Sequence, residues 1–285
     1  MTVNVLLAGC GDLGCEVARQ LVSAGHQVTG LRRSDSALPD GVKAFKADVT
    51  RPETLEALAE VHPDILVYCV VADAHTDESY RLHYVDGLHN VLSALAESES
   101  LRHVFFVSST GIYGQHSDDI LDETVEPIPA DFSGIRMRQA EDVLTTLAIP
   151  GTALRLSGIY GPGRNRMIRL ARDPQTWPAH NRWTNRIHRD DAARFIAFLV
   201  GRVQQGTPLA ECYLVTDSRP VAYYEVLLWL ATQMGVSTDQ VKTPTAGGAK
   251  RLSNARMLST GFTLRYPDYA SGYSSLLASE GTLAL

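Results

Sequence analysis

The sequence predicts an α/β protein built on a doubly wound parallel sheet, with a smaller substrate lobe formed by C-terminal segments. An apolar strand that starts at residue 3 enters a glycine-rich turn and then a helix. Apolar strands and helices continue to alternate, with short links, as far as residue 156. This alternation is typical of parallel sheets covered by helices on both faces, and its weakening after residue 157 indicates the smaller lobe.

The first strand–helix–strand unit occupies about the first 31 residues. Residues 3–8 are mostly apolar, as expected of a strand that is buried on both faces. Leu13, Val17 and Leu21 then share one helical stripe, and residues 27–31 form the second strand. The motif G-x-G-x-x-G joins the first strand to the helix, and in such a unit it predicts a dinucleotide-binding turn.

Each glycine of this turn has its own predicted role. Gly9 makes the tight turn, Gly11 lets a pyrophosphate approach the backbone, and Gly14 lets the helix pack closely on the strand. Asp12 and Leu13 begin the helix, whose free N–H groups and positive dipole end favour phosphate. We therefore expect these five residues to bind the cofactor. The alternative is a glycine-rich turn that binds nothing.

The later elements are predicted from the same periodicities. Strands are expected at residues 43–47, 64–71, 102–108, 151–156 and 211–216, and helices at residues 52–61, 77–97, 134–148, from 190 onward, and at 222–234. The resulting division assigns residues 1–158 and 186–218 to a dinucleotide-binding domain, and residues 159–185 and 219–285 to a substrate-binding lobe.

The charge balance and the cysteine pattern argue against several classes of protein. Lys and Arg number 26 and Asp and Glu number 32, so the net charge of −6 argues against nucleic acid as a partner. No apolar run approaches the ~18 residues of a membrane span, and a strand by residue 3 leaves no signal peptide, so a cytoplasmic protein is expected. The four cysteines lack C-x-x-C and zinc-type spacings, so no metal site is expected.

Five motifs follow one another along the chain. They are the glycine turn, Asp48-Val49 after the third strand, residues 107–114 (Val-Ser-Ser-Thr-Gly-Ile-Tyr-Gly), residues 154–163, and residues 186–191 (Arg-Ile-His-Arg-Asp-Asp). With these motifs the chain resembles the short-chain dehydrogenase/reductase superfamily, in its extended branch of NAD(P)-dependent epimerases and dehydratases. Extended members usually carry G-x-x-G-x-x-G, so the shorter spacing indicates an atypical subgroup.

The resemblance implies a Rossmann fold and further residues at the cofactor. Asp48 is expected to hydrogen-bond the adenine amino group, with Val49 packed beside it. The ends of the fourth and fifth strands are expected to line the dinucleotide. The residues concerned are Cys69, Val70, Val71 and Ser108.

The end of the second strand distinguishes NADP from NAD. An acidic residue there would accept a hydrogen bond from the ribose 2′-hydroxyl and repel a 2′-phosphate. The chain has Arg32-Arg33-Ser34 instead. Because a guanidinium forms charge-assisted hydrogen bonds to phosphate, Arg32 and Arg33 predict NADP. NAD remains the alternative, since an arginine pair that only faces solvent would leave the choice open.

The catalytic pair that the family uses is missing. The resemblance implies a Tyr-x-x-x-Lys pair on one helix face and a Ser or Thr that polarises a substrate carbonyl. Ser109 matches the serine, but Ser133 and Met137 stand at the tyrosine and lysine positions. Arg136 and Arg138 lie on either side of the lysine's place, and either arginine, Arg136 being the candidate chosen, could bind the ribose. Tyr113 is the candidate proton donor, and a structural or substrate-contacting role is its alternative.

Residues 164–189 are locally basic within an acidic chain. The arginines concerned are Arg166, Arg169, Arg172, Arg182 and Arg186. They suit a small anionic substrate such as a nucleotide sugar, and a solvated face that pairs with neighbouring Asp residues explains the same pattern. The histidines of the helical segments, His75, His83 and His89, are expected to be surface or helix residues rather than ligands.

Two functions are therefore predicted. The first is an NADP-dependent oxidoreductase or epimerase that acts on a sugar-nucleotide-like or small anionic substrate, because most of the motif set is present. The second is a catalytically silent NADP-binding regulator or redox sensor, because the Tyr-x-x-x-Lys pair is missing. Relatives often dimerise through helices that correspond to residues 77–97 and 134–148, so the chain is compatible with a homodimer.

Overall fold

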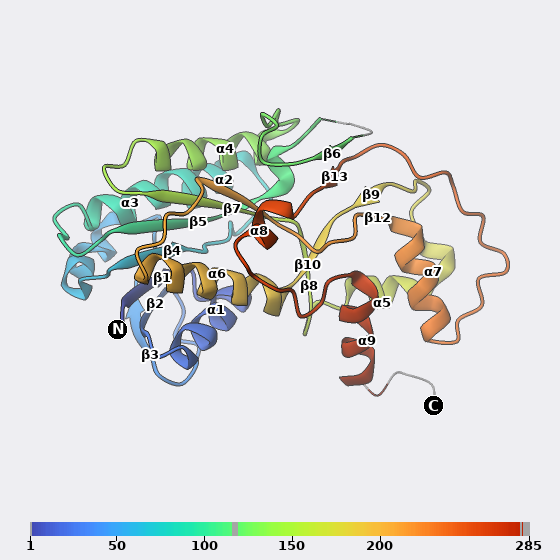
Figure 1. The fold of residues 1–285 in the computed structure, drawn as a ribbon, viewed down its shortest axis with the longest axis horizontal. Helices are drawn as coiled ribbons and strands as arrows, with labels where there is room; N and C mark the ends of the chain where they lie inside the picture. The colour runs from blue at the N-terminus through green and yellow to red at the C-terminus, as the bar shows by residue number, and fades with distance from the viewer. Residues whose placement is uncertain (1, 116–118, 280, 282–285) are drawn as a thin grey trace. The chain divides into compact units, whose positions relative to one another are not determined.

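The computed structural model describes residues 2–115, 119–279 and 281, and the chain divides into two compact units (Figure 1). The first is Met1–Gly114, Pro127–Arg155 and Ala192–Tyr213, and the second is Gln115–Glu126, Leu156–Asp191 and Leu214–Leu285. The strands of the main sheet are β1 (Asn4–Ala8), β2 (Gln27–Arg32), β3 (Val42–Lys46), β4 (Ile65–Tyr68), β5 (His103–Ser109), β7 (Gly151–Leu156) and β11 (Cys212–Val215). The helices connecting them are α1 (Asp12–Ser23), α2 (Asp77–Tyr80), α3 (Gly87–Ala94), α4 (Phe132–Thr145) and α6 (Arg189–Gln204).

The central sheet has the strand order β11-β7-β5-β4-β1-β2-β3. β1 pairs in parallel with β2, where Val5 lies beside Val28, and also with β4, where Val5 lies beside Ile65. The chain thus winds outward in both directions from β1, with α3 and α4 over one face and α1 and α6 over the other (Figure 1). The predicted doubly wound α/β fold is confirmed. Sheets of this kind bind ligands where the strand order reverses, at the carboxyl ends of β1 and β4.

Burial along the strands follows their apolar runs. Leu6 and Leu7 of β1 are completely buried, as is every residue of β4. β3 lies at the edge of the sheet, and its Lys43 and Lys46 are exposed. The central strands therefore supply the core, and the edge strand supplies solvent-facing charge.

The segment predicted as one helix over residues 77–97 is helical from Asp77 to Ala94, but its middle part is π-helical rather than α-helical. A π-helical segment, η3 (Arg81–Asp86), separates α2 from α3. The Tyr68 hydroxyl of β4 donates a hydrogen bond to the His83 carbonyl, and a Cβ at Gly87 would lie 2.6 Å from the same Tyr68 oxygen. Close contact with β4 thus accompanies the wide turn, and π segments of this kind are frequent at functional sites.

The predicted helix at residues 52–61 forms two short 3-10 segments, η1 (Pro52–Thr54) and η2 (Glu56–Val61). The Thr54 hydroxyl accepts a hydrogen bond from the Asp48 amide and lies 2.8 Å from the Arg51 carbonyl. These local bonds compete with the longer-range bonds of an α-helix, which explains the tighter turn.

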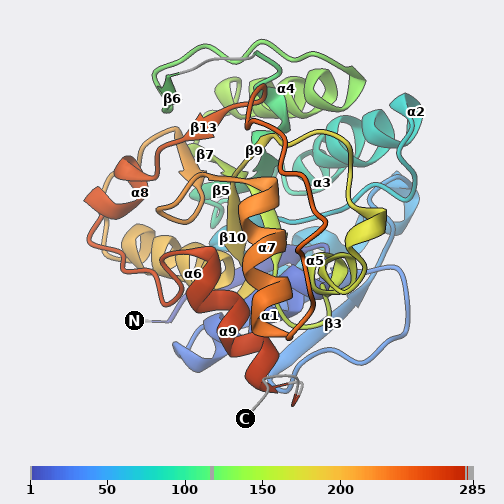
Figure 2. The same ribbon diagram turned by 90° about the vertical axis from the view of Figure 1, so that its right-hand side faces the viewer.

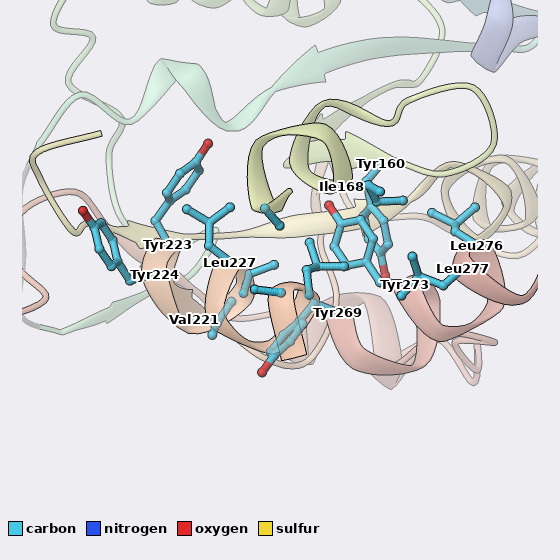
Figure 3. Packing of buried hydrophobic residues seen from close by; sticks show 14 of the residues in the cluster. Tyr160, Ile168, Val221, Tyr223, Tyr224, Leu227, Tyr269, Tyr273, Leu276 and Leu277 are labelled. Atoms are coloured by element: carbon cyan, nitrogen blue, oxygen red, sulfur yellow. The ribbon is translucent and has the colours of Figure 1, made fainter. Parts of the chain in front are cut away.

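The second unit packs three helices around an aromatic core. They are α5 (Arg166–Ala171), α7 (Tyr223–Gln233) and α9 (Tyr269–Ser279), which lie side by side (Figures 2 and 3). The rings of Tyr160 and Tyr273 pack against each other in this core, tilted by 31° with their centroids 4.5 Å apart. The Asp191 carboxylate accepts hydrogen bonds from the backbone amides of Arg265 and Tyr266, which ties the C-terminal segment to the unit.

The remaining short elements of the chain complete the description. They are η4 (Thr110–Ile112), β6 (Ile120–Leu121), β8 (Gly158–Tyr160), η5 (Pro174–Thr176), β9 (Trp183–Thr184), β10 (Arg186–His188), β12 (Val221–Ala222), β13 (Arg251–Leu252) and α8 (Ala255–Ser259).

Candidate functional site

The glycine turn between β1 and α1 has the geometry that each glycine requires. Gly9 has a φ of 95°, and a Cβ there would lie 2.4 Å from the Cys69 carbonyl oxygen. A Cβ at Gly14 would lie 2.2 Å from the Gly9 carbonyl oxygen. At Gly11, by contrast, a Cβ would meet no atom within 4 Å. Gly9 and Gly14 are therefore needed by the fold itself, whereas Gly11 leaves open space beside the backbone.

A pocket of about 240 Å³ opens at this turn, at the carboxyl ends of β1, β2 and β4. It brings together many of the residues predicted to bind the cofactor, which are Gly9, Gly11, Arg32, Arg33, Asp48, Val49, Cys69, Val70 and Val71. Cys10, Leu31, Ser34, Ala47 and His83 complete its lining. The pocket therefore lies where the sheet topology and the glycine motif both predict a dinucleotide.

Four predicted cofactor residues lie outside this lining. Asp12, Leu13 and Gly14 form the first turn of α1, and Gly11 caps that helix without a side-chain hydrogen bond. Ser108 is buried, and its hydroxyl donates to Glu141 Oε1. The first three keep the predicted position at a helix N-terminus, whereas Ser108 is engaged in a buried network.

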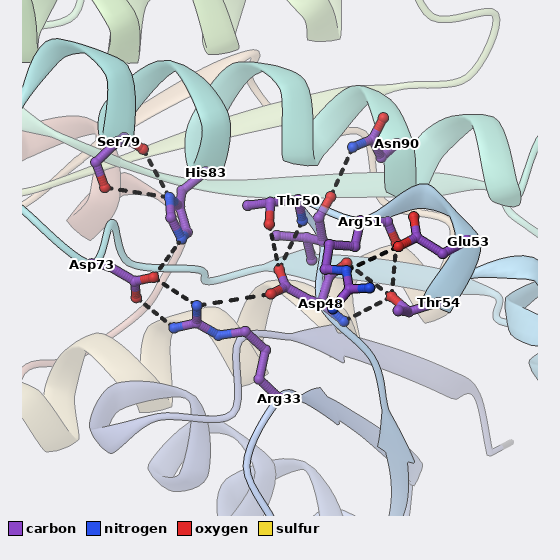
Figure 4. A network of polar contacts seen from close by, with 11 residues as sticks. Arg33, Asp48, Thr50, Arg51, Glu53, Thr54, Asp73, Ser79, His83 and Asn90 are labelled. Carbon is purple, nitrogen blue, oxygen red and sulfur yellow. Dashed lines mark hydrogen bonds and ion pairs between the residues drawn. The ribbon is translucent and has the colours of Figure 1, made fainter.

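The two arginines after β2 have different surroundings. Arg32 donates from Nη1 to the backbone carbonyls of Ser36 and Ala37, at 3.2 and 3.4 Å. Its Nε is buried and has no hydrogen-bond partner among the described residues. Arg33 instead forms a bidentate ion pair with Asp73, and its Nη1 lies 3.9 Å from Asp48 Oδ2 (Figure 4). Arg32 thus retains donor capacity at the pocket, while the charge of Arg33 is compensated by carboxylates.

Asp48 is held by its own loop. Its Oδ1 accepts hydrogen bonds from the Thr50 amide and hydroxyl, at 2.9 and 2.8 Å. Asn90 of α3 donates to the neighbouring Val49 carbonyl at 2.8 Å (Figure 4). These contacts fix the carboxylate at the pocket edge, where the adenine contact was predicted.

His83 and Asp73 belong to the site, although sequence reasoning missed both. His83 is only 6% exposed and lines the pocket; it belongs to the helical segment η3, so the prediction of a surface or helix residue holds for the helix but not for the surface. Its Nδ1 lies 2.8 Å from the Ser79 carbonyl oxygen, and its Nε2 lies 3.3 Å from Asp73 Oδ2. The π segment turns His83 inward, which a regular helical period does not predict. Asp73 comes soon after the buried fourth strand in the sequence, and this position is the signal that could have identified it as a residue of the site.

Tyr113 lies in a fully buried polar network. It is 1% exposed, and its oxygen accepts a hydrogen bond from Arg155 Nη1 at 2.6 Å. Arg155 also binds Glu141 through Nε and Nη2, the latter at 2.7 Å. Burial raises the pKa of Tyr113 to about 12, against the opposing effect of the Arg155 charge. This environment keeps the hydroxyl protonated at neutral pH.

The remaining catalytic candidates have local partners. Ser109 Oγ accepts a hydrogen bond from the Gly111 amide at 3.0 Å and so caps η4. Arg136 binds Asp77 through Nε and Nη2, at 2.7 and 2.8 Å. At the family's tyrosine and lysine positions, Ser133 donates to Asp131 and Met137 is buried. Ser109, Tyr113 and Arg136 do not line the glycine-turn pocket.

No membrane span or metal cluster is found in the parts of the chain that the structure describes. None of their helices is long and apolar enough to cross a bilayer. No group of three His, Cys, Asp or Glu side chains in residues 2–115, 119–279 and 281 is arranged to hold a metal ion.

The fold and the pocket define a nucleotide-binding protein of the short-chain dehydrogenase/reductase type. Residues 9–202 match the NAD(P)H-binding family model, and the chain belongs to that family. A protein from Methylobacillus flagellatus, assigned to the NAD-dependent epimerase/dehydratases, is 52% identical, with a TM-score of 0.90 over 98% of this chain and 99% of that chain. The expected membership of the epimerase/dehydratase group is confirmed.

More distant structures share the fold. The UDP-glucose 4-epimerase of Thermus thermophilus, solved with NAD, is 20% identical, with a TM-score of 0.75 over 94% of this chain and 96% of that chain. The enzyme WbmG of Bordetella bronchiseptica, solved with NAD and UDP, is 17% identical, with a TM-score of 0.80 over 99% and 97%. A comparison with functionally curated proteins returns no match.

Proposed function

We propose that the protein is an NADP-dependent oxidoreductase or epimerase. The observation that carries this proposal is the Arg32-Arg33-Ser34 sequence at the carboxyl end of β2, where it lines the same pocket as Gly9 and Gly11. An NAD-specific site would place a carboxylate there, whereas a guanidinium suits a 2′-phosphate. The buried Nε of Arg32, which has no hydrogen-bond partner within the described part of the chain, fits a site that gains an acceptor when ligand binds.

The predicted cofactor residues have distinct tasks in this proposal. The open space at Gly11 and the N-terminus of α1, with Asp12, Leu13 and Gly14, receive the pyrophosphate. Asp48 and Val49 hold the adenine, and the end of β4 lines the dinucleotide, with Ser108 buried behind. When bound, the nicotinamide supplies hydride exchange with a carbonyl or alcohol carbon.

The proposed substrate is sugar-nucleotide-like or a small anion. The support is the arginine-rich segment 164–189, together with relatives such as WbmG, which was solved with UDP. In this proposal the second unit carries the substrate-binding role predicted for residues 159–185 and 219–285. Ser109 polarises the carbonyl, Arg136 takes the ribose-binding task and Tyr113 is the proton-donor candidate.

The second candidate function is an NADP-binding regulator or redox sensor. Ser133 and Met137 replace the family's proton-transfer pair, and Tyr113 is buried against Arg155. Two cysteines also flank the glycine turn, with Cys10 Sγ and Cys15 Sγ 3.9 Å apart. Burial and the neighbouring Cys15, however, raise the pKa of Cys10 to about 12. Little of this thiol is then ionised at neutral pH, which counts against a redox role for Cys10 itself.

Titration of the purified protein with NADPH and NADH, followed by nucleotide fluorescence, tests the cofactor. Arg32→Ala should weaken NADPH by about 10- to 100-fold, the range for a lost charge-assisted hydrogen bond pair, and NADH by about threefold or less. Arg19→Ala removes a cation that pairs with Glu16 on α1 outside the pocket, and should change neither affinity. Equal losses of NADPH and NADH in Arg32→Ala contradict the NADP assignment. Absence of binding by both contradicts the dinucleotide function.

A turnover assay separates the two candidate functions. UDP-sugars and small anionic carbonyl compounds are offered with whichever nucleotide binds, and Ser109→Ala and Tyr113→Phe are compared with the unchanged protein. Turnover that falls about 100-fold or more in either variant supports the enzyme and identifies the group used. Nucleotide binding without turnover over the whole panel supports the regulator.

A further inference from the structure

Asp73 is positioned by contacts on both sides of it in the loop after β4. The Ala72 amide donates to the Tyr84 hydroxyl oxygen at 3.3 Å, and the Ala74 amide donates to Ser79 Oγ at 3.2 Å. Both partners come from the α2–η3 segment, so the loop is fixed to a helical support. These two hydrogen bonds therefore hold the loop in the position from which Asp73 contacts Arg33.

The Asp73 carboxylate is shared between two groups of the pocket. Both terminal nitrogens of Arg33 bind its two oxygens, and His83 Nε2 lies 3.3 Å from Oδ2 (Figure 4). The hydrogen bonds from Arg33 lower the pKa of Asp73, so the group is ionised at neutral pH. A second carboxylate, Asp48, lies 3.9 Å from Arg33 on the other side. The guanidinium is thus compensated by two carboxylates at the edge of the pocket.

This arrangement has different consequences for the two nucleotides. A 2′-phosphate at the end of β2 competes with Asp73 for the same guanidinium donors and is repelled by the carboxylate. A free ribose 2′-hydroxyl carries no charge, so it neither competes for the ion pair nor suffers that repulsion. Arg32 donates to the backbone carbonyls of Ser36 and Ala37, and these neutral acceptors leave its charge available to a phosphate in either case.

We infer that Asp73 is a specificity-determining residue: by holding Arg33 in an ion pair across the pocket edge, it weakens NADPH binding relative to NADH. Arg32 then supplies most of the phosphate recognition, and Arg33 contributes only when Asp73 releases it. This inference rests on the proposed NADP function of the same pocket.

The test measures dissociation constants of NADPH and NADH for the unchanged protein and for Asp73→Asn. The amide keeps the size of the side chain and one hydrogen-bond acceptor while removing the charge. We expect NADPH to bind about tenfold more tightly, the order expected when a carboxylate is removed beside a phosphate, and NADH to change by less than about twofold. An unchanged ratio of the two constants overturns the inference.

A matched control separates a local effect from a change of net charge. Asp142→Asn removes the same charge from an aspartate of similar exposure, 56% against 51%, which also pairs with an arginine, Arg138, at 3.0 Å. Asp142 pairs with Arg138, which does not line the pocket, whereas Asp73 pairs with Arg33, which does; the ratio of constants for Asp142→Asn should therefore stay unchanged. The same shift in Asp142→Asn as in Asp73→Asn contradicts a role specific to Asp73.

The background variant Arg33→Ala tests whether Asp73 acts through Arg33. In that background Asp73→Asn should improve NADPH binding by about threefold or less, because only direct repulsion remains. A full tenfold gain there would overturn the positioning role. Failure of the proposed function looks different, since NADPH then fails to bind the unchanged protein and every variant alike. Thermal unfolding of each variant verifies that this exposed substitution leaves the fold intact.

Discussion

Glu141→Gln is the substitution that most directly tests the buried network behind β5. Glu141 of α4 is 6% exposed and accepts hydrogen bonds from Ser108 Oγ and from Nε and Nη2 of Arg155. Arg155 is also 6% exposed, and its Nη1 donates to Tyr113. The substitution keeps the shape of the side chain but leaves the buried guanidinium without its counter-charge.

The expected loss of stability is large. Removing one partner of a buried, hydrogen-bonded ion pair costs about 3–5 kcal/mol, because the remaining charge stays desolvated. For a chain of this length about 2 °C of Tm corresponds to 1 kcal/mol, so Tm should fall by roughly 6–10 °C. Asp142→Asn, at the next position of α4, removes an exposed pair with Arg138 and should change stability by about 0.5 kcal/mol or less.

Differential scanning fluorimetry and urea unfolding at pH 7 measure both variants against the unchanged protein. A double variant, Glu141→Leu with Arg155→Met, removes both charges and should recover part of the loss, because an apolar pair of similar volume avoids desolvation. A Glu141→Gln protein that melts within about 2 °C of the unchanged one refutes the reasoning, because the buried charge would then be solvated or paired otherwise.

Three further predictions concern the glycine turn and the pH dependence of stability. Gly11→Ala should leave Tm within about 1 °C but weaken nucleotide binding at least tenfold, since its Cβ fills the open space through which the phosphate approaches. Gly14→Ala should instead lower Tm by several degrees in thermal scans, because its Cβ meets the Gly9 carbonyl. Burial lowers the pKa of His103 to about 4, so the unfolded chain binds the extra proton between pH 6.5 and 4. Acidification through that window should cost about 3 kcal/mol, and His103→Leu should flatten this limb of Tm against pH. Burial raises the pKa of Asp217 to about 7, so its effect on stability has the opposite sign, and stability falls as pH rises from about 4 to 7. In urea unfolding, Asp217→Asn should therefore stabilise the protein more at pH 8 than at pH 5, by on the order of 2–4 kcal/mol.

The sheet and the glycine turn could be predicted because their signals are local. Strands buried on both faces require unbroken apolar runs, as at residues 3–8, and the turn requires glycines at fixed spacing. The pocket residues followed from the same logic, since each predicted one lies at the end of a strand that was already located or shortly after it. β4 ends at Tyr68, earlier than expected, and the residues after it leave the sheet to line the pocket.

The missed features depend on contacts between distant parts of the chain. The π segment accompanies a hydrogen bond from Tyr68 to a carbonyl fifteen positions later, which no helical period encodes. His83 became a pocket residue through that segment. Arg155 stands within an apolar strand motif, and its partner Glu141 comes from another element, so the sequence alone gave no sign that the two charges would neutralise each other in the core.

The network of Arg155 bears directly on the choice between enzyme and regulator. A proton donor must reach the substrate and must titrate near the working pH. Tyr113 is 1% exposed, its pKa is raised to about 12 by burial, and its oxygen already accepts a hydrogen bond from Arg155. A tyrosine in this setting stabilises a buried guanidinium more readily than it transfers protons. If turnover is found, the half-buried Ser109 is consequently the better-placed hydroxyl, and Ser109→Ala should reduce activity more than Tyr113→Phe does.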